Sequence, residues 1–171
     1  MQLGITIPLQ KHLKTKKPEY GLPEDLFFCW EVHNILYYGK STLVAVNANN
    51  RFFVCQWDMQ LNDWKEWPLR METAIERGLE SQGYSRLQID HYFNLAGTSI
   101  ITKTHGRKPV AGLNKAIDHL NRLSSEETVT DLYLIEHCRK VNQGNYSPTG
   151  YDRIGRPVDF LKEDMRRIGI N

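Results

Sequence analysis

The stretch from residue 102 to residue 120, TKTHGRKPVAGLNKAIDHL, combines residue types that could hold an anion. Gly106 permits a tight turn, and Pro109 favours the first turn of a helix. The free N–H groups and the dipole of a helix N-terminus attract negative charge. The sequence therefore predicts a candidate anion- or nucleic-acid-binding site, with these residues adding charge or a hydroxyl group: Lys103, Thr104, Arg107 and Lys108.

An ordinary polar turn between a strand and a helix explains the same residues, because exposed turns commonly carry Lys and Arg. The stretch contains no glycine-rich phosphate loop. Asn114 lies at the edge of the apolar stripe of the following helix, where a hydrogen bond to a neighbouring loop accounts for it. Both interpretations stay open on the sequence alone.

Aromatic residues concentrate between residues 27 and 57, in FFCWEVHNILYYGKSTLVAVNANNRFFVCQW. Neighbours in a strand point to opposite faces, so these rings cannot all enter one core. Exposed rings beside basic side chains could stack on bases or contact a protein. The alternative, which we favour, is that helices cover both faces. The interaction surface predicted from this segment and from the C-terminal arginines comprises Trp30, Tyr38, Arg51, Arg153 and Arg156.

The titratable residues carry no recognisable catalytic or metal-binding motif. The six histidines show neither HExxH nor zinc-finger spacing, so no metal site is predicted. Glu31 and His33 share a strand face and could act as an acid/base pair, although a salt-bridged or solvated pair is more common. The sequence predicts no cofactor and leaves the catalytic residues unassigned. It favours a protein that is not an enzyme, while a site assembled from distant residues stays possible.

The pattern of apolar residues and turn signals predicts the elements that would position these groups. Gly39-Lys40 and Ala48-Asn49-Asn50 separate three strands of an antiparallel meander. Apolar residues at helical spacing, with proline, serine or glycine at the ends, predict the helices. We expect strands at 2–7, 27–38, 41–47, 51–57 and 98–104, and helices at 69–83, 86–96, 109–123, 124–141 and near the C-terminus. The predicted fold is α+β: an antiparallel sheet of about five strands with helices packed on it, plus a helical and irregular C-terminal extension.

The length and the charge limit the domain organisation and the location of the protein. A chain of 171 residues is about one domain with an appendage, here a core over 1–123 and an extension over 124–171 that packs on it. The formal charge of +2 does not by itself indicate nucleic acid. The three cysteines have no CxxC spacing, which favours reduced thiols. We find no signal peptide and no apolar run long enough to cross a membrane, and we expect a cytoplasmic protein.

Three segments of the chain together resemble an uncharacterised bacterial family known only as a domain of unknown function. They are the N-terminal strand before a lysine-bearing helix, the segment FFCWEVHNILYYGKSTLVAVNANNRF with its N–x–x–N–R hairpin, and AGTSIITKTHGRKPVAGLNKA, which is similar to the pattern AG…TKT…R…V…LN. The resemblance covers about residues 1–123 and implies no activity, cofactor or catalytic residue.

These observations favour a non-enzymatic binding protein of the bacterial cytoplasm that acts through a protein partner or through self-association. The first alternative is a nucleic-acid-binding protein that uses the basic helix N-terminus. The second is a small enzyme that acts on a phosphorylated or nucleotide substrate.

Overall fold

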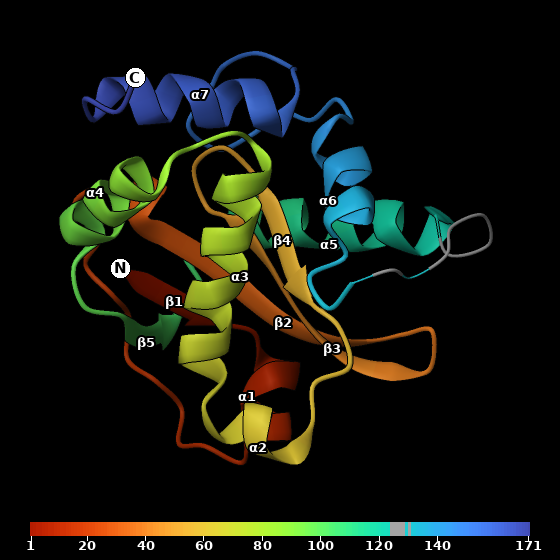
Figure 1. Ribbon diagram of the computed structural model, residues 1–171. Coiled ribbons are helices and arrows are strands. Elements are labelled where there is room, and N and C mark those ends of the chain that lie inside the picture. The colour runs from red at the N-terminus through yellow and green to blue at the C-terminus, as the bar shows by residue number, and fades with distance from the viewer. Residues whose placement is uncertain (124–128, 130) are drawn as a thin grey trace.

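A five-stranded sheet forms the centre of the molecule, with the strand order β4–β3–β2–β1–β5 (Figure 1). The computed structural model describes residues 1–123, 129 and 131–171. The strands are β1 (Gln2–Ile5), β2 (Cys29–Tyr37), β3 (Lys40–Asn47), β4 (Phe53–Gln56) and β5 (Ile100–Lys103). The helices are α1 (Ile7–Leu13), α2 (Leu61–Lys65), α3 (Trp67–Ser81), α4 (Arg86–Ala96), α5 (Arg107–Leu123), α6 (Ile135–Asn142) and α7 (Pro157–Arg167), with a short 3-10 helix at Leu26–Phe28.

The sheet is mixed, so the prediction of an antiparallel sheet is correct for only part of it. Strands β2, β3 and β4 form the predicted antiparallel meander. Strand β1 is parallel to both β2 and β5. Each parallel pair is joined by a connection that contains helices, which is the connection that parallel strands need. The register aligns Gly4 with Glu31 on one side and with Thr102 on the other.

Helices cover both faces of the sheet, as the favoured interpretation of the aromatic segment predicts (Figure 1). Alternation along the strands sends Trp30, Val32 and Val54 to one face, where α3, α4 and α7 complete the larger core. The opposite face takes Val44 and Phe53 under α5 and α6. The meander therefore alternates between two apolar cores and has no aromatic platform open to solvent.

The turn between β3 and β4 is a dense hydrogen-bond network built from asparagine side chains. The Asn47 amide donates to the Phe27 carbonyl (2.7 Å), and its oxygen accepts the backbone N–H groups of Asn49 and Asn50. The side-chain amides of Asn49 and Asn50 donate to Asp164 of α7, each at 2.9 Å. This network ties the C-terminal helix to the centre of the sheet.

The predicted helix over 124–141 is confirmed for residues 135–141 and is wrong for the described residues before them. Helix α6 begins only at Ile135, because residues 131–134 form a turn in which Leu134 has a φ of 46°. The Asp131 carboxylate accepts the N–H groups of Tyr133 and Ile135 and so begins the helix. The predicted capping box of Ser124 and Glu127 lies outside the described residues. Among the described residues, no helix is long and apolar enough to cross a membrane.

Both helices beyond residue 123 in the described part of the chain, α6 and α7, contribute to the cores. Leu161 and Met165 of α7 are buried in the larger core, and Cys138 and Val141 of α6 are buried in the smaller one. The predicted boundary between a core and an extension at residue 123 stays a prediction.

We expect Asp164→Ala to lower the free energy of unfolding by about 2–3 kcal/mol, because it leaves one buried and one half-buried amide without their acceptor. Asp152→Ala removes an exposed carboxylate from the preceding loop and should change stability by less than about 0.5 kcal/mol. Urea unfolding of both variants measures the difference. Equal stability of the two variants would show that the Asn49–Asn50–Asp164 network does not hold α7 in place.

Candidate anion-binding site

The turn between β5 and α5 has the expected form, but it does not gather the four predicted side chains. Gly106 has a φ of 115°, which a glycine adopts readily, and α5 begins at the next residue. The Lys103 ammonium lies over the Tyr20 ring, 3.9 Å from its centroid. Arg107 is exposed, and the Lys108 Nζ approaches the Thr149 carbonyl oxygen at 3.5 Å. Lys103 and Lys108 thus face different segments of the chain.

A buried glutamate holds this turn against the sheet. The Glu31 carboxylate, 0 % exposed, accepts the backbone N–H of His105 and lies 2.8 Å from its Nδ1. The Nε2 of the same ring lies 3.1 Å from the Gln2 side-chain oxygen. A side chain at position 4 would press on this pair, since a Cβ there would lie 3.0 Å from both Glu31 and His105. Both nitrogens of the His105 ring thus have a polar partner, and the contact between Glu31 and His105 holds the turn against the sheet.

Glu31 and His33, a possible acid/base pair by sequence, have different partners in the structure. The two residues do share a face of β2, but the Nδ1 of His33 lies 2.6 Å from the Thr6 hydroxyl. Burial lowers the pKa of His33. Glu31 instead takes His105, which the parallel pairing of β1 and β5 brings over it.

The Arg51 guanidinium is a buried charge that lacks a counter-ion among the described residues. Arg51 is 5 % exposed, and its Nε and Nη1 have no hydrogen-bond partner in the described part of the chain. Burial lowers the pKa of Arg51, and Tyr146 partly opposes that shift. Buried charges in proteins are almost always paired, so an unpaired guanidinium marks a position where an anion would be stabilised.

Helix α5 approaches this guanidinium so closely that a side chain at position 112 would have to displace it. A Cβ on Gly112 would lie 2.8 Å from the Arg51 Nε and 3.1 Å from its Cζ. The C-terminal loop crosses the same turn, because the Gly150 N–H donates to the Asn49 carbonyl at 3.0 Å. The Thr149 hydroxyl oxygen of that loop is also buried without a partner in the described chain. We call the group of Arg51, Lys108, Tyr146 and Thr149 the Arg51 site.

A cavity of about 350 Å³ lies beside Tyr146, between α5 and the C-terminal loop. Lys115 and Arg122 line it together with one carboxylate, that of Asp118. The Tyr146 hydroxyl lies 2.7 Å from the His119 Nδ1. Burial raises the pKa of Tyr146, while Arg122 and Arg51 lower it. Arg122, which lines the cavity, and Arg51, which does not, therefore both act on the Tyr146 phenol.

The residues predicted as an interaction surface fall into two groups. Trp30 is 1 % exposed and donates from its indole N–H to the Tyr92 hydroxyl, and Arg51 is buried as described above, so neither lies on a surface. Tyr38 is 42 % exposed at the β2–β3 turn. Arg153 pairs with Glu163, and Arg156 pairs with Asp159. Arg153 and Arg156 thus lie three residues apart and both pair with α7, whereas Tyr38 lies at the β2–β3 turn.

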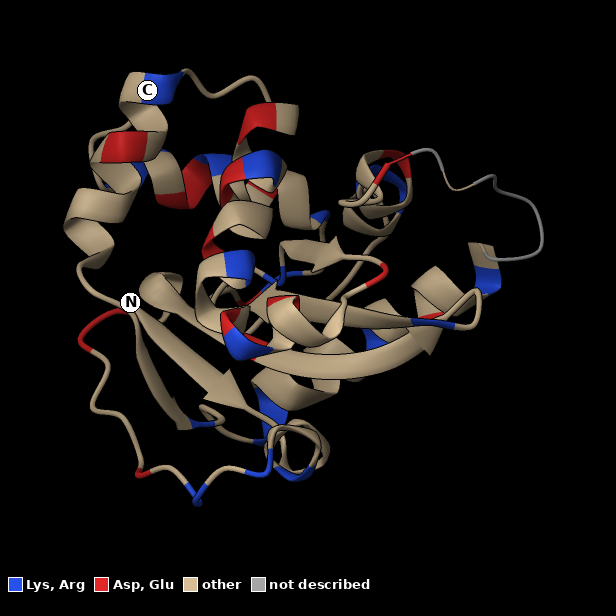
Figure 2. Cartoon of the chain, turned by 60° about the horizontal axis from the view of Figure 1, so that its bottom comes forward, with Lys and Arg blue, Asp and Glu red and all other residues tan. Residues whose placement is uncertain are grey.

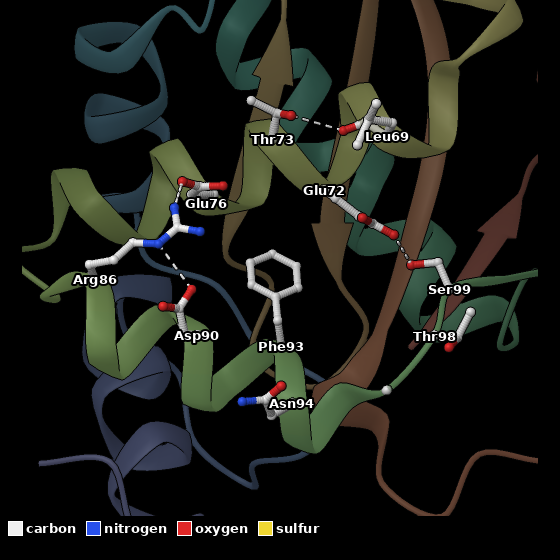
Figure 3. Close-up of a pocket in the computed structure, with 11 residues that line it drawn as sticks. Leu69, Glu72, Thr73, Glu76, Arg86, Asp90, Phe93, Asn94, Thr98 and Ser99 are labelled. Carbon is white, nitrogen blue, oxygen red and sulfur yellow. Dashed lines mark hydrogen bonds and ion pairs between the residues drawn. The ribbon is translucent and has the colours of Figure 1, made fainter.

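A cavity of about 580 Å³ lies between α3 and α4, and its lining includes three carboxylates and one arginine, which disfavours an anion (Figure 3). Arg86 bridges the carboxylates of Glu76 and Asp90, and Glu72 accepts the Ser99 hydroxyl. Among the described residues, no group of three His, Cys, Asp or Glu side chains could hold a metal ion. Figure 2 shows basic and acidic residues on the same helices, so the charge of a helix alone does not indicate a site. The buried Arg51 guanidinium is a more specific indication of an anion site than these exposed charges.

Sequence reasoning missed two residues of the Arg51 site, Tyr146 and Thr149, and also Gly112, which contacts Arg51. Gly112 carried a usable signal, because a glycine inside an otherwise good helix costs about 1 kcal/mol and indicates a close approach. Tyr146 and Thr149 lie in an irregular loop about 100 residues beyond Arg51, and no spacing rule connects them.

The chain belongs to a family described as a domain of unknown function, DUF6933, which it matches over residues 2–160. The match confirms the resemblance and extends it past residue 123 into the segment that carries Tyr146 and Thr149. No curated protein and no solved structure matches the chain.

The stability of the protein should decrease as the pH falls below about 6.5, the ordinary pKa of histidine. Burial, assisted by Arg122, lowers the pKa of His119 in the folded protein. The unfolded chain then binds a proton more readily than the folded one, so stability is lost as the pH falls toward the folded pKa.

The variant His119→Gln keeps an acceptor for the Tyr146 hydroxyl and cannot titrate. Its free energy of unfolding should fall less than that of the wild type between pH 7.5 and 5.5, as measured by urea unfolding. Identical pH dependence in the two proteins would mean that His119 is equally easy to protonate in the folded and unfolded states.

Proposed function

We propose that the protein binds a small ligand that carries a phosphate group, and that Arg51 is the principal contact. The observation that supports the proposal is the buried guanidinium with neither a carboxylate nor a hydrogen bond at its Nε and Nη1 in the described chain. Leaving such a charge unpaired costs several kcal/mol, because water no longer solvates it. An anion that reaches it would recover that cost.

A purely structural arginine would look different. It would donate to backbone carbonyls or to a carboxylate, as Arg167 does to Asp25 and Asp164. The turn that carries Arg51 already satisfies its backbone through Asn47 and Asn50, so the guanidinium is not needed to hold it. The position of the guanidinium therefore favours a role toward a ligand.

The other members of the Arg51 site can all act as donors toward a phosphate. Tyr146 and Thr149 offer hydroxyl groups, and Lys108 offers an ammonium group. Arginine suits phosphate in particular because its planar N–H groups match two oxygens at once. The adjoining cavity with Lys115 and Arg122 has room for a further part of the ligand or a second phosphate.

Nucleic acid is the second candidate, and the spacing of charges on α5 favours it. Lys108, Lys115 and Arg122 follow one another at intervals of seven residues and are all exposed. Residues seven apart lie on the same side of a helix, so the three form a stripe about 21 Å long. Such a stripe could follow a phosphate backbone, while Arg51 would take one phosphate.

The earlier hypotheses of a protein partner or self-association and of a small enzyme stay predictions. Tyr38, Arg153 and Arg156 could still contribute to a protein contact, since each is accessible or held by exposed ion pairs. The Arg51 site favours ligand binding, with or without chemistry on the ligand.

The variant Arg51→Met separates a ligand-binding role from a structural one. It should reduce the affinity for inorganic phosphate and for AMP at least about tenfold, because the bidentate donor is lost. It should also raise the free energy of unfolding in phosphate-free buffer by about 1 kcal/mol, because it removes an unpaired buried charge. Calorimetric titration and urea unfolding measure the two effects.

The matched control is Arg107→Gln, which removes the same charge from an exposed position of the β5–α5 turn. It should leave both quantities nearly unchanged. If Arg51→Met destabilises the protein and the wild type binds neither phosphate nor AMP, the guanidinium is structural and the proposal is wrong. Binding of labelled DNA or RNA that weakens steeply with salt and is lost in Lys115→Gln/Arg122→Gln would put nucleic acid first.

A further inference from the structure

Two of the three cysteines meet in the smaller core, although they are 83 residues apart in the chain. The Sγ of Cys55 on β4 lies 3.4 Å from the Sγ of Cys138 on α6. Both thiols also approach one acceptor, the Tyr133 carbonyl oxygen, at 3.6 and 3.5 Å. The two sulfur atoms therefore lie side by side over the same carbonyl group.

The backbone around the two sulfur atoms is held in a fixed alignment. Phe53 lies two residues before Cys55, and Asn142 lies one helical turn after Cys138. The Asn142 side chain accepts the Phe53 N–H at 2.7 Å and donates to the Phe53 carbonyl at 2.9 Å. Phe53 and Cys55 are neighbours on one strand face, and Cys138 and Asn142 are neighbours on one helix face. A disulfide bond is about 2.05 Å long, so a shift of about 1.4 Å between the sulfur atoms would close it.

We propose that Cys55 and Cys138 form a redox-active dithiol that a hydroperoxide oxidises to an intramolecular disulfide. The sulfur of Cys138, the more exposed of the two, attacks one oxygen of hydrogen peroxide, the O–O bond breaks, and water leaves as a sulfenic acid forms. The sulfur of Cys55 then attacks the sulfur of Cys138, the S–O bond breaks, and a second water leaves with the thiol proton. Two thiols lose two electrons and two protons, and one peroxide becomes two waters.

The surroundings of the pair define which oxidant can act and how fast. Cys55 is 1 % exposed and Cys138 is 6 % exposed, so a small oxidant is needed. Burial, together with the contact to Cys138, raises the pKa of Cys55 well above its ordinary value. Because the thiolate is the nucleophile, the disulfide should form slowly at neutral pH and faster as the pH rises.

Cys29 provides an internal control within the same chain. It is buried on β2, donates to the Asp25 carbonyl and has no thiol within reach among the contacts described. Burial and the charge of Glu31 raise the pKa of Cys29 to about 12. It should stay a thiol under conditions that oxidise the pair.

Closing the disulfide would fasten α6 to β4, and α6 ends immediately before the loop that carries Tyr146. A cross-link over a long loop restricts the unfolded chain, so the oxidised protein should unfold at a higher temperature. This inference does not depend on the proposed ligand.

The experiment exposes the folded wild type and the variants Cys29→Ser and Cys138→Ser to hydrogen peroxide at two pH values. The remaining thiols are then alkylated under denaturing conditions and counted by mass spectrometry, which separates thiol loss from methionine oxidation. The wild type should fall from three thiols to one, with a peptide pair linked through Cys55 and Cys138, and Cys29→Ser should fall from two to none. A reductant should restore the thiols and reverse an upward shift of the unfolding temperature.

The variant Cys138→Ser should form no intramolecular disulfide. If Cys138→Ser folds poorly, the result from Cys29→Ser still tests the inference. The inference is overturned if the wild type keeps three thiols, if its cysteines end as sulfinic acids, or if the disulfides join two chains. It is equally overturned if Cys29 is consumed at the same rate as the other two.

Discussion

The turn from Asn47 to Arg51 joins the parts of the molecule that are far apart in sequence. Its asparagine side chains reach Phe27 before β2 and Asp164 in α7, and its arginine lies against Gly112 of α5. Because these contacts leave from five consecutive residues, the position of each partner depends on the others. The sheet, α7 and α5 therefore meet at the turn that carries Arg51.

Two buried charged groups lie at this turn, Arg51 within it and Asp164 of α7 against it, and their surroundings differ. Asp164 is 2 % exposed, and although burial raises its pKa, the amides of Asn49 and Asn50 oppose that shift and satisfy its oxygens. The Arg51 guanidinium, on the residue after Asn50, has no such hydrogen bonds at its Nε and Nη1 within the described chain. A protein that surrounds one buried charge with donors and leaves the next one open has kept a cost that stability alone does not explain.

The sequence predicted the elements far better than it predicted how they meet. Gly39 and the asparagine turn predicted the meander, Pro68 and Gly83 marked the ends of α3, and Ser85 and Gly97 marked those of α4. Pro109 marked the start of α5, which begins two residues earlier, at Arg107. The direction of β1 was not predictable from its own residues, because a four-residue strand pairs equally well either way until its connections are known. The basic residues of the β5–α5 turn suggested an anion site, yet only Lys108 of the four lies at the Arg51 site. Arg51 itself was read as a surface residue, since nothing local shows that α5 and a loop near residue 149 cover it.

The central claim is that an anion meets the Arg51 guanidinium, and NMR of the arginine side chains tests it most directly. The Nε–H resonance of Arg51 is assigned by its loss in Arg51→Met and is then followed while inorganic phosphate is added to the wild type. If an anion binds there, that resonance should shift saturably, and by more than the resonance of any exposed arginine such as Arg107. A resonance that does not move while phosphate reaches saturating concentrations would contradict the claim.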